Sequence, residues 1–276
     1  MSLLKVDLTA CDRDGACVDV CPLGILELDP EGGPRVLPNA GHHCIGCGHC
    51  VAVCPHGALD NARNPLSLQD PCLPGGSLDR ARALEFLRTR RSVRRYRKEA
   101  VPRDTLLQLL EASRYAPSGH NSQGLSYIIV EDGQVLRQIG SIVIEWMREF
   151  CRVQEQLARS LHMSGVIRSW ERGEDRVLRD APQLIAACAP KDLLPARVTA
   201  YLALEYVELY ATTLGLGTCW AGYAQVCAQQ HPGIPRLLRL SSDKEIVGMM
   251  MVGYPLYSYH RLPYRNPVEV VWHEPS

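Results

Sequence analysis

Residues 44–55 read CIGCGHCVAVCP, and residues 11–22 read CDRDGACVDVCP. The run at 44–55, which is the second along the chain, spaces its cysteines as C-x2-C-x2-C-x3-C-P. Thiolates at this spacing ligate [4Fe-4S] clusters, with three bound to one cluster and the fourth bound to its neighbour. The first run keeps the same spacing except that Asp14 replaces one cysteine. Seven thiolates and one carboxylate therefore predict a pair of iron–sulfur clusters.

Asp14 leaves the type of one cluster open. A carboxylate is a harder ligand than a thiolate and binds the iron of such a cluster more weakly. The first cluster is therefore either an aspartate-ligated [4Fe-4S] or a [3Fe-4S] centre. Structural zinc bound by four thiolates is the alternative. Zinc sites rarely combine three closely spaced cysteines with a fourth that precedes proline.

Residues 1–60 resemble the bacterial two-cluster ferredoxins through these two runs. The resemblance implies that the fourth cysteine of each run serves the cluster of the other run. It assigns cluster one to Cys11, Cys17 and Cys54, with Asp14 as a possible fourth ligand. It assigns cluster two to Cys44, Cys47, Cys50 and Cys21.

The composition is that of an ordinary globular protein large enough for two domains. The chain has 276 residues, 46% of them apolar, and a formal net charge of zero. A neutral chain argues against nucleic acid as a partner. The sequence contains no apolar run of about 18 residues that could cross a membrane, and its start has no secretory signal pattern. Unpaired thiols and oxygen-sensitive clusters predict a cytoplasmic location.

A composition change divides the chain. Residues 61–78, NARNPLSLQDPCLPGGSL, hold three prolines and two adjacent glycines and are predicted to be a linker. It separates an iron–sulfur domain over 1–60 from a second domain over 79–276. In the second domain, patterning predicts helices over 79–89, 103–115, about 134–162 and 196–214. It predicts strands over 127–131, 183–189, 245–252 and 268–272. The fold class is therefore α+β.

The helix over 196–214 is apolar on nearly every face, which is typical of a helix in a core or at a subunit interface. Glu205 and Glu208 interrupt its apolar surface. We expect these carboxylates to be paired or to reach an edge rather than to be catalytic.

Three segments of the second domain carry polar chemistry. RRSVRRY at 90–96 offers guanidinium and hydroxyl donors that suit a phosphate dianion. APSGHNSQ at 116–123 offers small and amide residues that suit a polar heterocycle. GLGTCWAG at 215–222 follows a predicted helix, and its third glycine is misplaced for a dinucleotide-binding fingerprint. We interpret it as a glycine-rich turn that lets backbone amides approach a flat ligand.

Together with the tail HRLPYRNPVEVVW at 260–272, these segments resemble the FMN-dependent nitroreductase family over about residues 80–276. The resemblance implies an α+β domain that dimerises and binds FMN at the subunit interface. It assigns the FMN phosphate to Arg90, Ser92 and Arg261. It assigns the polar edge of the isoalloxazine to Arg94 and Asn121, the ribityl chain to Ser118, and the N5 side to the backbone of Ala221 and Gly222.

The chain departs from the family pattern at one position in the tail. Tyr259 stands where the family often has a lysine, and Arg91 or Arg265 would supply the missing cation. The flavin carries the chemistry in this family, so no catalytic side chain is assigned.

The expected function is an iron–sulfur flavoprotein oxidoreductase that acts as a homodimer. Electrons from a ferredoxin or similar donor would pass through the clusters to FMN and on to a nitroaromatic, quinone, enone or free flavin. Two alternatives remain: an electron-transfer module that serves a partner protein, and an oxygen-using flavin enzyme of the same fold.

Overall fold

The computed structural model describes residues 2–29, 31–72 and 78–273 and divides into two compact units. Unit 1 comprises Met1–Ser77 together with Gly119–Ser122. Unit 2 comprises Leu78–Ser118 together with Gln123–Ser276. Residues 73–77 of the predicted linker lie outside the described residues.

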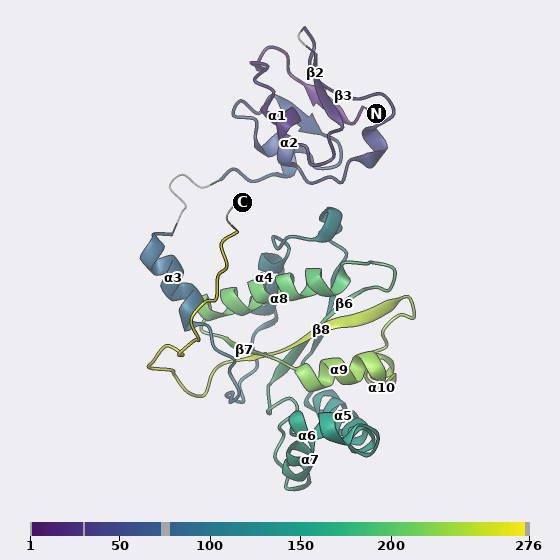
Figure 1. Cartoon of the computed structure of the whole chain (residues 1–276), viewed down its shortest axis with the longest axis vertical. Helices are drawn as coiled ribbons and strands as arrows, with labels where there is room; N and C mark the ends of the chain where they lie inside the picture. The colour runs from purple at the N-terminus through teal and green to yellow at the C-terminus, as the bar shows by residue number, and fades with distance from the viewer. Residues whose placement is uncertain (1, 30, 73–77, 274–276) are drawn as a thin grey trace. The chain divides into compact units, whose positions relative to one another are not determined.

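Unit 1 is built from two short antiparallel strand pairs and two single-turn helices (Figure 1). Strand β1 (Leu4–Val6) pairs with β4 (Leu59–Asn61), and β2 (Leu26–Asp29) pairs with β3 (Gly33–Val36). Helices α1 (Ala16–Asp19) and α2 (His49–Ala52) each carry one cysteine of the two runs, Cys17 or Cys50. The 3-10 turns η1 (Gly41–His43), η2 (Leu66–Leu68) and η3 (Gly119–Asn121) complete the unit.

Glycine sets the start of both single-turn helices. Gly15 before α1 and Gly48 before α2 have φ values of 78° and 75°. This left-handed conformation is easily adopted only by a residue without a Cβ. Each helix then turns its buried cysteine toward a small apolar core that includes Leu4, Leu26 and Val51.

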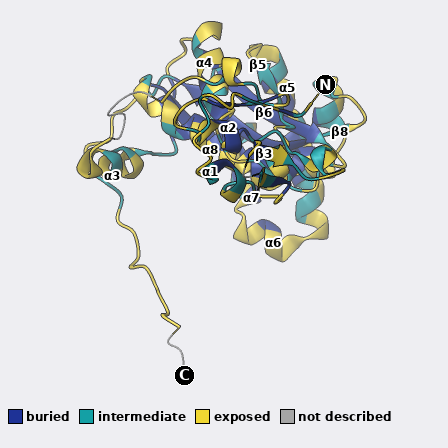
Figure 2. Ribbon diagram, turned by 90° about the horizontal axis from the view of Figure 1, so that it is seen from above, coloured by how far each residue is buried: buried dark blue, intermediate teal, exposed yellow. Residues whose placement is uncertain are grey.

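Unit 2 is organised around one antiparallel sheet in the order β5-β6-β8-β7. Its strands are β5 (Ser126–Val130), β6 (Gln183–Pro190), β7 (Gly217–Trp220) and β8 (Lys244–Gly253). The central strands β6 and β8 are buried along most of their length, which Figure 2 shows as dark blue. Both faces of these strands are therefore covered by helices.

Successive residues of β6 pack alternately into two separate hydrophobic cores, because side chains on a strand point to opposite faces in turn. Leu184 and Ala186 pack with α5 (Gly133–Val153), α7 (Met163–Glu171), α9 (Gly222–Gln230) and α10 (Gly233–Leu237). Ile185 and Ala187 pack with α4 (Arg103–Ser113) and α8 (Ala196–Thr213). In β8, a Cβ at Gly248 would lie 2.5 Å from Leu204 Cδ1, so glycine lets α8 approach the sheet closely.

The predicted α+β fold is confirmed, but three expectations about its elements are wrong. The helix expected over about 134–162 is two helices, α5 and α6 (Glu155–Ser160), which are separated at Gln154. The glycine-rich turn over 215–222 contains strand β7, which pairs with β8. The strand expected over 268–272 is not formed, since this segment finds no neighbouring strand among the described residues and leaves Val268 and Trp272 84–86% exposed.

Helix α3 (Arg80–Thr89) opens unit 2 and leads directly into the arginine-rich segment. Its N-cap is Asp79, whose carboxylate accepts the backbone N–H groups of Ala81 and Arg82. Among the helices of the described residues, none combines the length and the apolar character that crossing a membrane requires.

Candidate functional site

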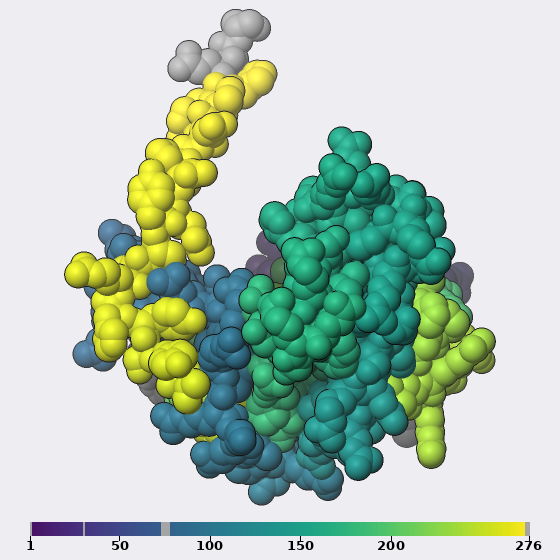
Figure 3. Space-filling view, turned by 90° about the horizontal axis from the view of Figure 1, so that it is seen from below, coloured from purple at the N-terminus to yellow at the C-terminus, as the bar shows by residue number. Residues whose placement is uncertain are grey.

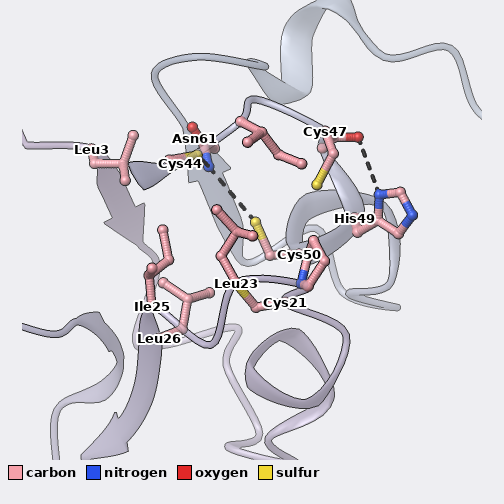
Figure 4. Close-up of a pocket in the computed structure, with 13 residues that line it drawn as sticks. Leu3, Cys21, Leu23, Ile25, Leu26, Cys44, Cys47, His49, Cys50 and Asn61 are labelled. Carbon is pink, nitrogen blue, oxygen red and sulfur yellow. Dashed lines mark hydrogen bonds between the residues drawn. The ribbon is translucent and has the colours of Figure 1, made fainter. Parts of the chain in front are cut away.

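Four thiols that the sequence assigned to one cluster line a single cavity of unit 1. Figure 4 shows Cys21, Cys44, Cys47 and Cys50 around it, with Asn61 between two of them. Gly46 has a φ of 63°, and with Gly48 it supplies the tight turns that bring Cys47 back toward Cys50. Four thiols around one cavity are the donor set of a [4Fe-4S] cluster, so the residues present fit this group.

Asn61 makes polar contacts to two of these thiols. Its amide Nδ2 donates to Cys44 Sγ and to Cys50 Sγ, both at 3.7 Å. Its Oδ1 accepts the backbone N–H of Arg63 at 2.9 Å, which fixes the amide with its nitrogen toward the sulfurs. Only 3% of Asn61 is exposed, so both contacts are shielded from water.

Burial raises the pKa of the Cys50 thiol, and the nearby thiols of Cys44 and Cys47 raise it further. The hydrogen bond from Asn61 acts in the opposite direction. An unliganded thiol here therefore resists ionisation, whereas bound iron would stabilise the thiolate through its own charge. The Cys50 side chain is therefore expected to ionise to the thiolate in this pocket only when a metal cation is bound.

Cys17 lies in α1, and Asp14 lies two residues before this helix begins. Burial raises the pKa of the Cys17 thiol, and the charges of Cys50, Asp14 and Cys11 raise it further. Asp14 Oδ1 accepts the backbone N–H of Ala16 at 3.0 Å. Cys54 Sγ accepts the backbone N–H of Ala58 at 3.3 Å. Asp14 is thus held next to the start of α1, on the chain segment that carries Cys17.

In unit 2, the segment 90–93 is attached to strand β7. Ser92 forms a bridge with Thr218, and Val93 N donates to Thr218 O at 2.8 Å. Arg90 Nη1 lies 3.2 Å from Glu208 Oε1, and Thr218 Oγ1 donates to the same oxygen at 3.2 Å. Glu208 is 3% exposed. The expectation that Glu208 is paired is met by this geometry, which also fixes Arg90 in place, because losing either charge of a buried pair is costly.

Arg91, Tyr259 and Arg261 are brought together by the C-terminal segment. Arg91 Nη2 donates to Arg261 O at 3.0 Å, and its guanidinium lies 4.9 Å from the centre of the Tyr259 ring. Figure 3 shows this segment, in yellow, beside the blue segment that contains α3. Tyr259 therefore contacts the Arg91 guanidinium through its ring, although this tyrosine stands where the family often has a lysine. Arg265 Nη1 only reaches the carbonyl of Tyr264.

Arg94 and Gly222 line a cavity in unit 2 that has a volume of about 370 Å³. Gly222 is the first residue of α9, where backbone N–H groups lack acceptors within the helix. The N–H of Ala221, in contrast, donates to Met249 O at 2.9 Å. Of the two backbone amides expected at the flavin N5, the Ala221 amide is already used in the sheet and the Gly222 amide is the better placed donor.

Ser118 and Asn121 are not among the residues that line this cavity. Ser118 Oγ accepts the N–H of Gln123 at 3.2 Å and lines a different cavity, together with Ser113, Tyr127 and Thr199. Asn121 belongs to unit 1, where its Nδ2 donates to the carbonyls of Ile45 and Gly46 at 3.1 Å. His120 and Asn121 both have a φ of 52°, so this loop is strained at two consecutive non-glycine residues.

Two polar residues of the sites were not singled out by sequence reasoning. Asn61 has no motif of its own, although it follows the last cysteine of the second run by seven positions. Arg179 lines the Arg94 cavity from the loop before β6. Its only signal in the sequence is a basic residue four positions before the buried strand, which is too common to indicate a site.

Two family models match the chain. The nitroreductase family model matches residues 87–254, and the model of the 4Fe-4S dicluster domain matches residues 3–62. The chain is 27% identical over 177 residues to an iodotyrosine deiodinase of Thermotoga neapolitana, which covers 62% of this chain and 87% of that protein. It is 29% identical over 191 residues to an NADH dehydrogenase of Thermus thermophilus, which covers 65% of this chain and 91% of that protein.

Solved structures agree on the fold of the second domain. A nitroreductase with bound FMN from Desulfitobacterium hafniense matches with a TM-score of 0.55 and 20% identity, and the match covers 68% of this chain and 97% of that one. The expected class, an FMN-dependent oxidoreductase of this family with iron–sulfur clusters, is confirmed at the level of the family. The chain belongs to the nitroreductase family and carries a 4Fe-4S dicluster domain at its N-terminal side.

Proposed function

We propose that the chain passes electrons from a ferredoxin-type donor through two iron–sulfur clusters to FMN and on to an organic acceptor. The observation that supports this most is the cavity of unit 1, where Cys21 meets Cys44, Cys47 and Cys50. Clusters of this type move single electrons. A chain that joins them to a nitroreductase domain has both an entry point for single electrons and a cofactor that delivers them in pairs.

For the clusters, the eight residues of the two runs are the proposed ligands. Cluster two, a [4Fe-4S] cluster, would be held by Cys44, Cys47, Cys50 and Cys21. Cluster one would be held by Cys11, Cys17 and Cys54, either as [4Fe-4S] with Asp14 as the fourth ligand or as [3Fe-4S] without it. Asn61 would donate hydrogen bonds to two thiolates of cluster two.

For FMN, the proposed phosphate site consists of Ser92 and the guanidinium groups of Arg90, Arg91 and Arg261. Glu208 orients Arg90 through its Nη1 and leaves the other N–H groups of the guanidinium available. Bound FMN would supply the electron and hydride chemistry. Arg94 would bind the polar edge of its isoalloxazine, and the Gly222 amide would lie at the N5 side. The apolar walls formed by Trp220 and Tyr223 would exclude water.

The second half of the flavin site is proposed to come from a partner subunit. Val198, Leu202, Tyr206 and Tyr210 recur every four residues on the outer face of α8 and are 37–63% exposed. Such a stripe of large apolar side chains is typical of a protein interface. A symmetric dimer through α8 would bury it.

Anaerobic turnover tests the proposed function. The purified holoenzyme is given reduced ferredoxin, NADH or NADPH, together with a nitroaromatic, a quinone, an enone or free flavin. We expect reduced ferredoxin to support reduction of at least one of these acceptors. If FMN is reduced by ferredoxin but no small acceptor is turned over, the chain is instead an electron-transfer module that serves a partner protein.

A further inference from the structure

The cavity that holds Arg94 contains two further arginines, Arg176 and Arg179, which no motif of the family assigned. Both come from the loop between α7 and β6. Among the described residues that line this cavity, none is acidic. Three guanidinium groups without a carboxylate make the cavity strongly attractive for an anion.

Arg179 is held in place by its own loop. Arg179 and Asp180 have φ values of 59° and 53°, an unfavourable backbone conformation for side-chain-bearing residues. The carboxylate of Asp175 stabilises it by accepting the N–H groups of Val177 at 2.7 Å, Leu178 at 2.9 Å and Asp180 at 3.3 Å. Strained backbone that is supported in this way is often found at ligand sites.

The guanidinium groups are available to a ligand. Arg179 is half-buried and forms no ion pair within the described part of the chain. Its charge and that of Arg94 both act on Cys219, a residue of the cavity wall, and both lower the pKa of that thiol against the larger effect of burial. Arg176 Nη2 lies 3.4 Å from Glu174 Oε2, but both side chains are about half exposed, so the pair is weak.

The remaining wall is aromatic and apolar. Trp146 comes from α5, Trp220 from the end of β7 and Tyr223 from α9. The Tyr223 hydroxyl donates to Leu161 O at 2.7 Å, which fixes its ring at the wall. Flat aromatic walls favour a planar ring through stacking and edge-to-face contacts.

We propose that the acceptor bound in this cavity is a planar aromatic compound with a negatively charged group, such as a carboxylate. Arg179 and Arg176 bind the anion, since a guanidinium matches a carboxylate with two parallel hydrogen bonds. Trp146 and Tyr223 contact the ring. The inference rests on the proposed function, because Arg94 and Gly222 of the same cavity are the proposed contacts of FMN.

The experiment compares 4-nitrobenzoate with the neutral 4-nitrobenzamide, which has nearly the same size and the same nitro group. Reduction of the nitro to the nitroso group takes up two electrons and two protons and releases one water, with the electrons supplied by reduced ferredoxin. Affinities of benzoate and benzamide for the oxidised holoenzyme are measured in parallel from changes in the flavin absorbance. Arg179→Gln and Arg176→Gln are the test variants.

Arg172→Gln is the matched control, because Arg172 lies just before the same loop and pairs with Glu174 but does not line the cavity. We expect Arg179→Gln to lower kcat/KM for 4-nitrobenzoate and the affinity for benzoate by about ten-fold or more. Values for the two amides should change less than two-fold. Arg176→Gln should have a smaller effect of the same kind, and Arg172→Gln should have none.

Three results would overturn the inference: equal loss for the charged and the neutral compound, no loss for either, or release of FMN by folded Arg179→Gln. The last would mean that Arg179 binds the flavin. Turnover of the full set of acceptors by the unmodified enzyme tests the proposed function separately. If no acceptor of that set is reduced while benzoate still binds in an Arg179-dependent way, the proposed function is wrong and the anion site stands.

Discussion

At the residue scale, Asn61 is the residue of unit 1 that we expect to tune a cluster. Its amide nitrogen contacts two thiols that the sequence assigns to one cluster, and its oxygen is bound by the backbone of Arg63. Hydrogen bonds to cluster sulfurs favour the reduced, more negative state and so raise the reduction potential. A single side chain can therefore set how readily this cluster accepts an electron.

We predict that Asn61→Leu lowers the midpoint potential of this cluster by roughly tens of millivolts, because a side chain of similar size has no donor. Asn64→Leu is the matched control, since Asn64 Nδ2 donates to the carbonyl of Gly46 in the same loop and not to a sulfur. The measurement is a redox titration followed by EPR. Equal potentials in Asn61→Leu and the unmodified protein would contradict this role.

Asp14 should make the other cluster the more labile one, because a carboxylate holds iron less tightly than a thiolate. We predict that mild oxidation converts this cluster to [3Fe-4S] and that Asp14→Cys suppresses the conversion. Asp12→Asn, on the same segment, should leave it unchanged. Low-temperature EPR of the three proteins provides the measurement, and the absence of a three-iron signal from all of them would show that Asp14 has no such effect.

At the scale of elements, α8 connects the core to a proposed subunit interface. Its inner face carries Ala200, Leu204 and Val207 against the sheet, and Glu208 against Arg90. Its outer face carries the apolar stripe that includes Leu202 and Tyr206. A change at the interface should therefore weaken FMN binding, because Glu208 of the same helix holds Arg90 of the proposed phosphate site.

We predict that Leu202→Glu combined with Tyr206→Glu dissociates the dimer and releases FMN. Loss of two buried apolar side chains, each about 1.5–3 kcal/mol, should weaken association by about 100-fold or more. Leu157→Glu on α6 is the control, because Leu157 is also exposed but lies outside the stripe. Sedimentation equilibrium and flavin content are measured together. A double variant that remains a flavin-loaded dimer would place the interface elsewhere.

At the scale of the whole molecule, the question is whether electrons use the clusters to reach FMN. Covalent attachment raises the local concentration of the cluster domain at the flavin without any new contact. A donor that reduces the clusters should then reduce FMN faster than a donor that must approach the flavin directly.

We predict that Cys47→Ser slows FMN reduction by ferredoxin at least ten-fold, because one ligand of the proposed [4Fe-4S] cluster is lost. Reduction of FMN by dithionite should remain. Cys72→Ser is the control, since Cys72 is an exposed thiol outside both runs. Stopped-flow absorbance gives the rates. Equal rates with ferredoxin for Cys47→Ser and the unmodified protein would mean that the clusters are bypassed.

Several features of this chain could be predicted from the sequence because they depend on short-range patterns. The cysteine runs are recognisable because three cysteines lie within seven residues, as at Cys44–Cys50, and they indicated the 4Fe-4S dicluster domain. The local pattern of apolar and polar residues predicts helices α3, α4 and α8 and strands β5, β6 and β8. The segments around Arg90, Ser118 and Gly217 indicated the family because their residue types and order are specific, although their positions in space were not predictable.

Tertiary structure alone decided the features that depend on distant partners. Strand β7 exists because β8 offers it hydrogen bonds, and the segment 268–272 has the residues of a strand but no such neighbour in the described chain. Glu208 meets Arg90 across 118 positions, and Arg179 meets Arg94 in one cavity only after β6 joins the sheet. Local sequence determines which conformations a segment can adopt, whereas the free energy of hydrogen bonds and charge pairs depends on which distant groups the fold brings within reach.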